Sequence, residues 1–142
     1  MTRLFRHEQL VPASPDRVVE FFHDVRNLPR VSPRFPALEV PVQDGRVRPG
    51  AVIPVRLSLG PLRRTLTTRI LHVAPDGAFT DSIEGGPFEH WEHTHRFEPF
   101  GGGTRIVDEI VYTPRLWIGP LAGIALWMMF ALRRRAIQRL LQ

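Results

Sequence analysis

The spacing of apolar residues changes once along the chain, and this change limits the folds available to it. Between residues 38 and 113, apolar and polar residues alternate in short runs, which is typical of strands. Short turn sequences such as Asp44-Gly45 and Pro75-Asp76-Gly77 separate the runs, so we expect one antiparallel meander. Strands are expected at residues 2–11, 38–42, 51–59, 62–73, 78–84, 88–98 and 104–113.

Helical patterns flank this alternating region on both sides. Ser14 followed by Pro15 is the combination of a capping residue and a first-turn proline that starts a helix. We expect a short helix there and a second short turn or helix at residues 31–36. Residues 120–141 are long enough for a helix of about 33 Å, which would cross the whole sheet. The pattern therefore predicts the α+β class.

The expected C-terminal helix is apolar on all sides over its first three turns. Stepping 100° per residue separates two faces, and Leu126 and Phe130 fall on one of them. We expect the other face to be the one toward the sheet, and it carries Leu121, Ala125, Met128 and Leu132. The outer face would then contact a membrane surface, form a homodimer, or lie under the short helices. A membrane span is disfavoured because Gly119, Pro120 and Gly123 shorten the uncharged run to less than about 20 residues.

The charged residues exclude several classes of function. The chain has 142 residues, no cysteine and no lysine, so disulfides, cysteine-ligated zinc and Schiff-base chemistry are excluded. The net charge is +5, but the arginines are scattered among acidic residues, and we expect no nucleic-acid partner. The first ten residues carry charges where a signal peptide needs an apolar run, so we expect a cytoplasmic protein.

Several local motifs resemble one family over almost the whole chain. The motifs are Pro15-x-x-x-Val19-x-x-Phe22, Asn27-Leu28-Pro29, Gly85-Gly86-Pro87-Phe88-x-x-Trp91-x-His93-x-His95-x-Phe97 and Gly103-Thr104-x-x-x-Asp108. Together with the element order they resemble a bacterial subgroup of the START and polyketide cyclase/dehydrase superfamily (SRPBCC).

This resemblance implies a helix-grip fold, in which a curved antiparallel sheet of about seven strands wraps around a long C-terminal helix. We expect residues 1–142 to form one such domain. The resemblance also implies an apolar cavity between sheet and helix that binds a small hydrophobic molecule such as a lipid, polyketide or quinone. The expected role is that of a carrier or sensor. Family members also include cyclases and dehydrases, and the fold alone does not choose between these roles.

The candidate site lies on two adjacent strands. Alternation places Trp91, His93, His95 and Phe97 on one strand face, and Asp108 and Tyr112 on the neighbouring strand. The histidines have three interpretations: a hydrogen-bonded core network with Asp108 and the Tyr112 hydroxyl, a polar group that orients a ligand or acts as acid and base, or a metal site with Asp108. We predict no metal and no cofactor. The predicted ligand contacts are Trp91, His93, His95, Phe97, Asp108, Tyr112, Leu121, Ala125, Met128 and Leu132.

Overall fold

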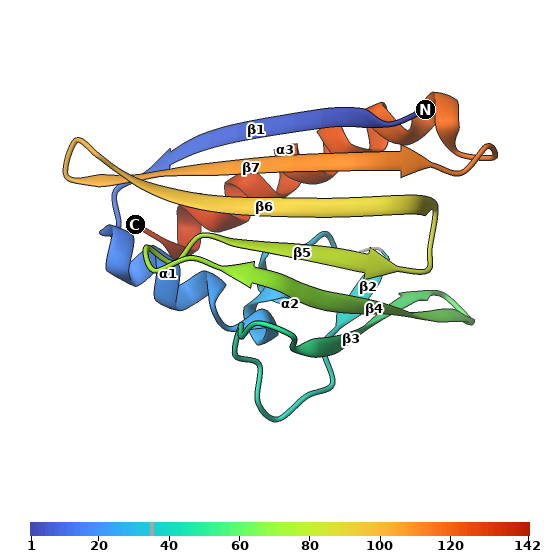
Figure 1. Cartoon of the computed structure of the whole chain (residues 1–142), viewed down its shortest axis with the longest axis horizontal. Helices are drawn as coiled ribbons and strands as arrows, with labels where there is room; N and C mark the ends of the chain where they lie inside the picture. Colours follow the sequence, from blue (N-terminus) through green and yellow to red (C-terminus); the bar gives the residue numbers. More distant parts are fainter. Residues whose placement is uncertain (35) are drawn as a thin grey trace.

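A seven-stranded antiparallel sheet forms the body of the computed structural model, which describes residues 1–34 and 36–142 (Figure 1). The strands are β1 (Arg3–Val11), β2 (Ala37–Glu39), β3 (Val52–Leu59), β4 (Leu62–Val73), β5 (Phe79–Glu84), β6 (Phe88–Phe100) and β7 (Gly103–Pro114). Their order across the sheet is β1-β7-β6-β5-β4-β3-β2. The strands from β2 to β7 therefore form the predicted meander, and β1 pairs with β7 at the far edge.

Two short α-helices and one 3-10 turn follow the first strand. Helix α1 (Pro15–Phe22) begins as predicted, because the Ser14 hydroxyl accepts a hydrogen bond from the backbone N–H of Arg17. The turn η1 (Val25–Asn27) leads directly into α2 (Leu28–Val31). The expectation of a second short turn or helix at residues 31–36 was wrong in position, since α2 begins at Leu28 with Pro29 in its first turn. Phe35, within that expected range, lies outside the described residues.

Helix α3 (Ala122–Leu140) follows the 3-10 turn η2 (Gly119–Leu121) and runs obliquely along one face of the sheet (Figure 1). Its first half packs with Trp91, Ile110 and Tyr112 of β6 and β7. Its last two turns pack with α1 and the other end of the sheet, through Ala136 and Ile137. The predicted helix-grip architecture is confirmed. No helix in the described part of the chain is both long and apolar enough to cross a membrane.

Two features shape the sheet around these helices. The pairing register shifts between Ile70 and His72 and between Phe88 and His90, and such irregularities increase the local twist of a sheet. The turn at Gly77 packs directly on α1, where a Cβ would lie 2.6 Å from a methyl carbon of Val19. Gly77 also has a φ of +93°, so the turn requires glycine for both reasons. The β4–β5 turn is thereby held against α1.

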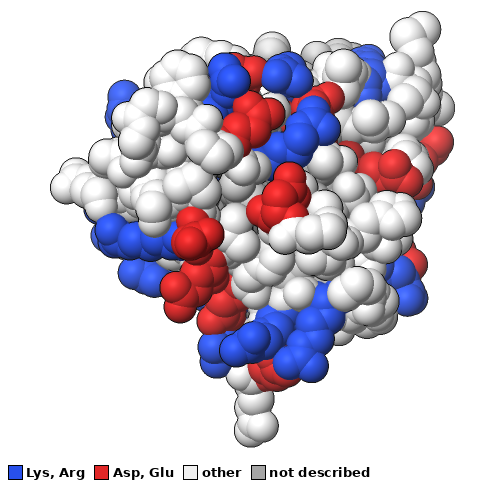
Figure 2. Space-filling model, turned by 60° about the vertical axis from the view of Figure 1, so that its left-hand side comes forward, with Lys and Arg blue, Asp and Glu red and all other residues white. Residues whose placement is uncertain are grey.

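The charged side chains are interleaved by sign on the molecular face shown in Figure 2, where basic and acidic groups lie next to one another. This arrangement on that face agrees with the scattered arginines of the sequence.

Candidate functional site

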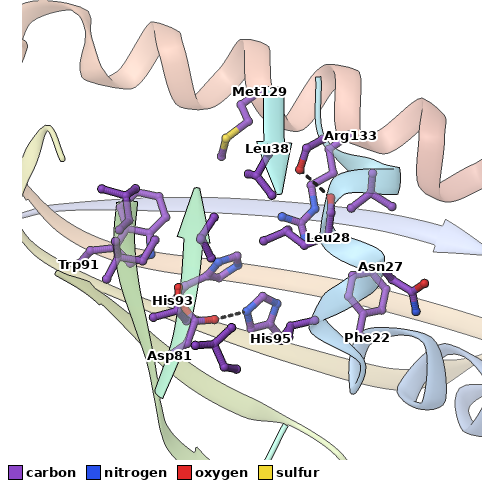
Figure 3. Close-up of a pocket in the computed structure, with 18 of the residues that line it drawn as sticks. Phe22, Asn27, Leu28, Leu38, Asp81, Trp91, His93, His95, Met129 and Arg133 are labelled. Atoms are coloured by element: carbon purple, nitrogen blue, oxygen red, sulfur yellow. Dashed lines mark hydrogen bonds and ion pairs between the residues drawn. The ribbon is translucent and has the colours of Figure 1, made fainter. Parts of the chain in front are cut away.

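A cavity of about 300 Å³ lies between the concave face of the sheet, the α1–α2 segment and the middle of α3 (Figure 3). Most of its lining is apolar. The apolar side chains include Phe22, Val31, Leu38, Ile53, Val55, Leu66, Ile70, Phe79, Ile83, Phe88, Trp91 and Met129. Polar side chains interrupt this lining on the α1–α2 segment (Asp24, Asn27 and Ser32), at Thr68, on the central strands of the sheet and on α3, and the last two places carry the titratable and cationic groups considered next.

The polar group on the sheet is a chain of two histidines and two aspartates. His95 Nε2 lies 2.7 Å from Asp81 Oδ2, and His93 Nε2 lies 2.8 Å from Asp108 Oδ1. Because a carboxylate only accepts hydrogen bonds, both Nε2 atoms carry the proton. His95 Nδ1 is 3.4 Å from the same Asp108 oxygen but makes no hydrogen bond. Asp108 therefore lies between the two imidazoles, and Asp81 holds the outer end of the chain.

The strand register brings these four residues together. Asp81 pairs with His93 across β5 and β6, and His95 pairs with Asp108 across β6 and β7. All four point to the concave face because each strand alternates its side chains, and all four are buried. The rings of Phe79, His95 and His93 also stack, with centroids 4.2 Å and then 3.7 Å apart. The imidazoles are thus fixed by both hydrogen bonds and packing.

The pKa values of the two histidines are shifted in opposite directions. Burial alone would lower the pKa of His95, but Asp108 and Asp81 raise it above its ordinary value. Burial lowers the pKa of His93, and the neighbouring His95 lowers it further, so His93 is neutral near pH 7. Burial opposes ionisation of Asp108, yet the hydrogen bond from His93 and the nearby His95 imidazole keep its pKa well below the usual range. The network therefore favours protonation of His95, beside two carboxylates, and presents a neutral imidazole at His93.

The polar group on α3 is Arg133, which extends toward the cavity in Figure 3. Arg133 is the first of three consecutive arginines, yet it is only 8% exposed. Its guanidinium lies against the rings of Phe22 and Phe130. The cavity therefore has one strongly cationic side chain on its helix wall.

The structure separates the sheet residues predicted from the sequence into two groups. Trp91, His93 and His95 line the cavity. Asp108 lies behind His93, while Phe97 and Tyr112 are packed in the two core clusters. The expected interaction of Asp108 with a histidine is therefore present, whereas no hydrogen bond joins the Tyr112 hydroxyl to this network among the residues described.

The prediction of which face of α3 points to the sheet was wrong. Leu121, Met128 and Leu132 are at least half exposed, and Ala125 is exposed as well. The inward face instead carries Ala122, Leu126, Phe130, Arg133, Ala136 and Ile137. A helix that is apolar on all sides does not define its own inward face, and contacts decide it. The ring of Phe130 packs against Phe5 and His7 of β1, which fixes the rotation of α3.

Sequence reasoning also missed two polar residues of the site, Asp81 and Arg133. Asp81 alternates with Phe79 and Ile83 in β5, so its inward position was readable from the strand pattern. Arg133 gave no such signal, because its position depends on the rotation of α3.

Asp81, His93 and His95 bring three ligand-type atoms within 4.8 Å of one another, a spacing that suits a metal ion. The sequence had suggested Asp108 rather than Asp81 as the third ligand. However, the Nε2 atom of each histidine is already bonded to a carboxylate. A cation would have to displace at least one of these bonds, so the donor set fits a proton network better than a vacant metal cage.

Comparisons with known proteins agree with the geometry. The family model for polyketide cyclase/dehydrase and lipid transport matches residues 11–141. A search of curated proteins found no match. A solved structure from Chromobacterium violaceum has a TM-score of 0.79 at 14% identity, covering 97% of this chain and 96% of that one. A START superfamily protein from Mycobacterium smegmatis has a TM-score of 0.76 at 14% identity, covering 97% and 96%. Ginseng major latex-like protein, from Panax ginseng, has a TM-score of 0.71 at 13% identity, covering 99% and 97%.

Proposed function

Because the chain belongs to the polyketide cyclase/dehydrase and lipid transport family, we propose that it binds a small hydrophobic molecule between the sheet and α3, as a carrier or sensor. The observation that carries this proposal is the largely apolar cavity of about 300 Å³. This volume is at the lower end of the range for small-molecule pockets, so it suits one acyl chain, a compact polyketide or a quinone. We assign ligand contact to Trp91, His93 and His95 on the sheet and to Met129 on the helix.

Titration with the neutral fluorescent dye Nile red tests this proposal. Thr68 lines the cavity, whereas Thr67, its neighbour on β4, points to the opposite face of the sheet. Thr68→Trp places an indole in the cavity and should weaken dye binding at least tenfold. Thr67→Trp adds the same group outside and should leave the affinity nearly unchanged. Equal affinity in both variants would place the dye elsewhere and refute the proposal.

A second candidate function is an enzyme of the cyclase or dehydrase kind, in which His93, His95 and Asp108 carry the chemistry. The supporting observation is the buried network with a neutral His93 at the cavity wall. With Nε2–H directed to Asp108, His93 has its free lone pair on Nδ1, where it would serve as a general base. The proton accepted at Nδ1 would return to the product from the same atom, and His95, held by Asp81 and stacked on His93, would keep that ring in place.

Substitution separates the two functions. His93→Ala or His95→Ala should leave the affinity for Nile red within about tenfold if the cavity only buries apolar surface. If the network is catalytic, the same variants should abolish conversion of a linear diketone to its cyclic product, followed by mass spectrometry. Absence of turnover in the wild-type protein would remove support for the second function.

The outer face of α3 offers a surface for exchange of the ligand with a membrane. Its exposed strip consists of Leu121, Ile124, Trp127, Met128 and Leu132, and Trp117 lies just before the helix. The chain after Glu109 carries five arginines and no carboxylate side chain. Exposed tryptophans beside arginines suit an anionic lipid surface, so we propose peripheral contact there.

Vesicle co-sedimentation tests this contact. The protein should sediment with phosphatidylglycerol vesicles more than with phosphatidylcholine vesicles, and Trp127→Gln should weaken the association. A stable dimer by light scattering, disrupted by Trp127→Gln, would instead assign the strip to a second copy of the chain and refute membrane contact.

A further inference from the structure

The three consecutive arginines of α3 do not share one environment. Arg133 faces inward, one helical turn after Met129, and both residues line the cavity. Arg134 and Arg135 are exposed on the outside of the helix. Because successive residues are rotated by about 100°, the side chains point in different directions: Arg134 donates to the Glu8 carbonyl at the β1 edge of the sheet, and Arg133 points to the cavity. The inward position of Arg133 therefore places a permanent positive charge at the cavity wall.

Arg133 has no protein partner for this charge among the residues described. Its Nε is buried without a hydrogen bond, and no carboxylate in the described chain lies within 4.0 Å of its guanidinium. Its contacts are the faces of the Phe130 and Phe22 rings, 5.5 and 5.9 Å from the guanidinium carbon. Buried charges are normally paired, because leaving water costs several kcal/mol per ion. The guanidinium therefore offers one buried, unpaired donor, Nε, to a ligand acceptor at the cavity wall.

The other carboxylates at the cavity wall are already engaged. Asp81 binds His95, and Asp24 forms an ion pair with Arg26 at 2.7 Å. Each of these carboxylates already has its own partner, so neither depends on Arg133.

We propose that Arg133 binds the carboxylate of an amphipathic ligand, so that the molecule carried is a hydrophobic carboxylic acid. This inference rests on the proposed binding function. Arg133 is the one arginine among the described side chains of the cavity wall, and one guanidinium matches one carboxylate in charge and in its two-pronged geometry. A phosphate dianion would leave one negative charge unpaired in an apolar cavity.

The surroundings of Arg133 also orient the acid. The guanidinium lies at Phe22, within the core cluster that includes α1. Met129, one turn earlier, packs on the cluster that includes Trp91. An acid bound at Arg133 would therefore lay its apolar body beneath Met129 toward Trp91. His93 and His95 lie along this path on the opposite wall (Figure 3).

Displacement of Nile red by decanoate and by 1-decanol at pH 8 tests the inference, since the two competitors differ in their charged group. Arg133→Met should weaken decanoate about tenfold to a hundredfold, the range expected for a hydrogen-bonded charge pair. The affinity for 1-decanol should change less than about threefold. Arg133→Lys keeps the positive charge but lacks the two parallel N–H donors of the guanidinium, and should recover part of the lost affinity. Arg135→Met, on the exposed side of α3, is the matched control and should change neither competitor.

The failures can be told apart. If dye and 1-decanol bind but Arg133→Met affects both competitors equally, the carboxylate assignment is wrong while the binding function stands. If neither the dye nor 1-decanol binds the wild-type protein, the binding function is refuted and the inference with it. Dye binding by Arg133→Met also reports that this variant is folded.

Discussion

Replacing Asp108 by asparagine removes the central charge of the buried network while keeping its shape. Asp108 is 2% exposed and accepts a hydrogen bond from His93 at 2.8 Å. A hydrogen bond to a charged acceptor stabilises by about 1.5–3 kcal/mol and a neutral one by about 1 kcal/mol, so this bond alone loses about 1–2 kcal/mol. The removed carboxylate also lies 3.4 Å from His95 Nδ1 and attracts this imidazole when it is protonated.

That attraction is about 5 kcal/mol at an effective dielectric constant of about 20, but the amide avoids the several kcal/mol needed to bury a carboxylate. We therefore expect Asp108→Asn to lower the free energy of unfolding by roughly 2–4 kcal/mol at pH 7. Urea denaturation measures this value. Glu109→Gln is the matched control, because Glu109 is the next residue of β7, lies on the outer face and pairs with Arg6 and Arg96. It should cost less than about 1 kcal/mol.

The pH dependence of the unfolding free energy tests the role of Asp108 in a second way. The pKa of Asp108 is lowered in the folded protein, so its stabilisation is present above the unfolded carboxyl pKa of about 4 and is lost as the pH falls through the folded value. The difference between wild type and Asp108→Asn should therefore shrink as the pH falls from about 4 toward 3. A cost at pH 7 no larger than that of Glu109→Gln would refute the assigned role of Asp108.

Three further predictions concern the same elements. Asp81→Asn removes one of the two carboxylates that raise the pKa of His95, so an NMR titration should show that pKa lowered; an unchanged value would contradict the network. Leu126→Ala should lower the unfolding free energy by about 2–5 kcal/mol, because Leu126 is buried. Met128→Ala should lower it by under about 1 kcal/mol, because Met128 is 54% exposed. The reverse order in urea denaturation would contradict the observed rotation of α3. Chelation by EDTA should leave the Tm unchanged, whereas a fall that zinc restores would assign Asp81, His93 and His95 to a metal.

The inward face of β6 was predictable because the alternation along this strand is strict from Trp91 to Phe97. One face of β6 carries Trp91, His93 and His95, and all three are buried in the structure. The same rule applied to β5 would have identified Asp81, which shares a face with Phe79. The pairing of histidines with aspartates then follows from the meander, because neighbouring strands bring these faces into contact.

The rotation of α3 was not predictable from its own residues. Leu126 and Met128 are equally apolar, so the pattern contains no preference between the face of one and the face of the other. The choice depends on the fit of Phe130 against β1, which is a contact between the two ends of the chain. The inward position of Arg133 follows from that fit, and so the candidate anion site was invisible in the sequence.

The central claim, that a ligand occupies the space between α3 and the sheet, is tested most directly at two adjacent methionines. The chain has three methionines, and Met129 lines the cavity while Met128 lies on the outer strip. With ¹³C-labelled methionine methyl groups, a bound 1-decanol should give nuclear Overhauser effects to Met129 and none to Met128. Contacts to Met128 without contacts to Met129 would place the ligand on the outside of the helix and contradict this account.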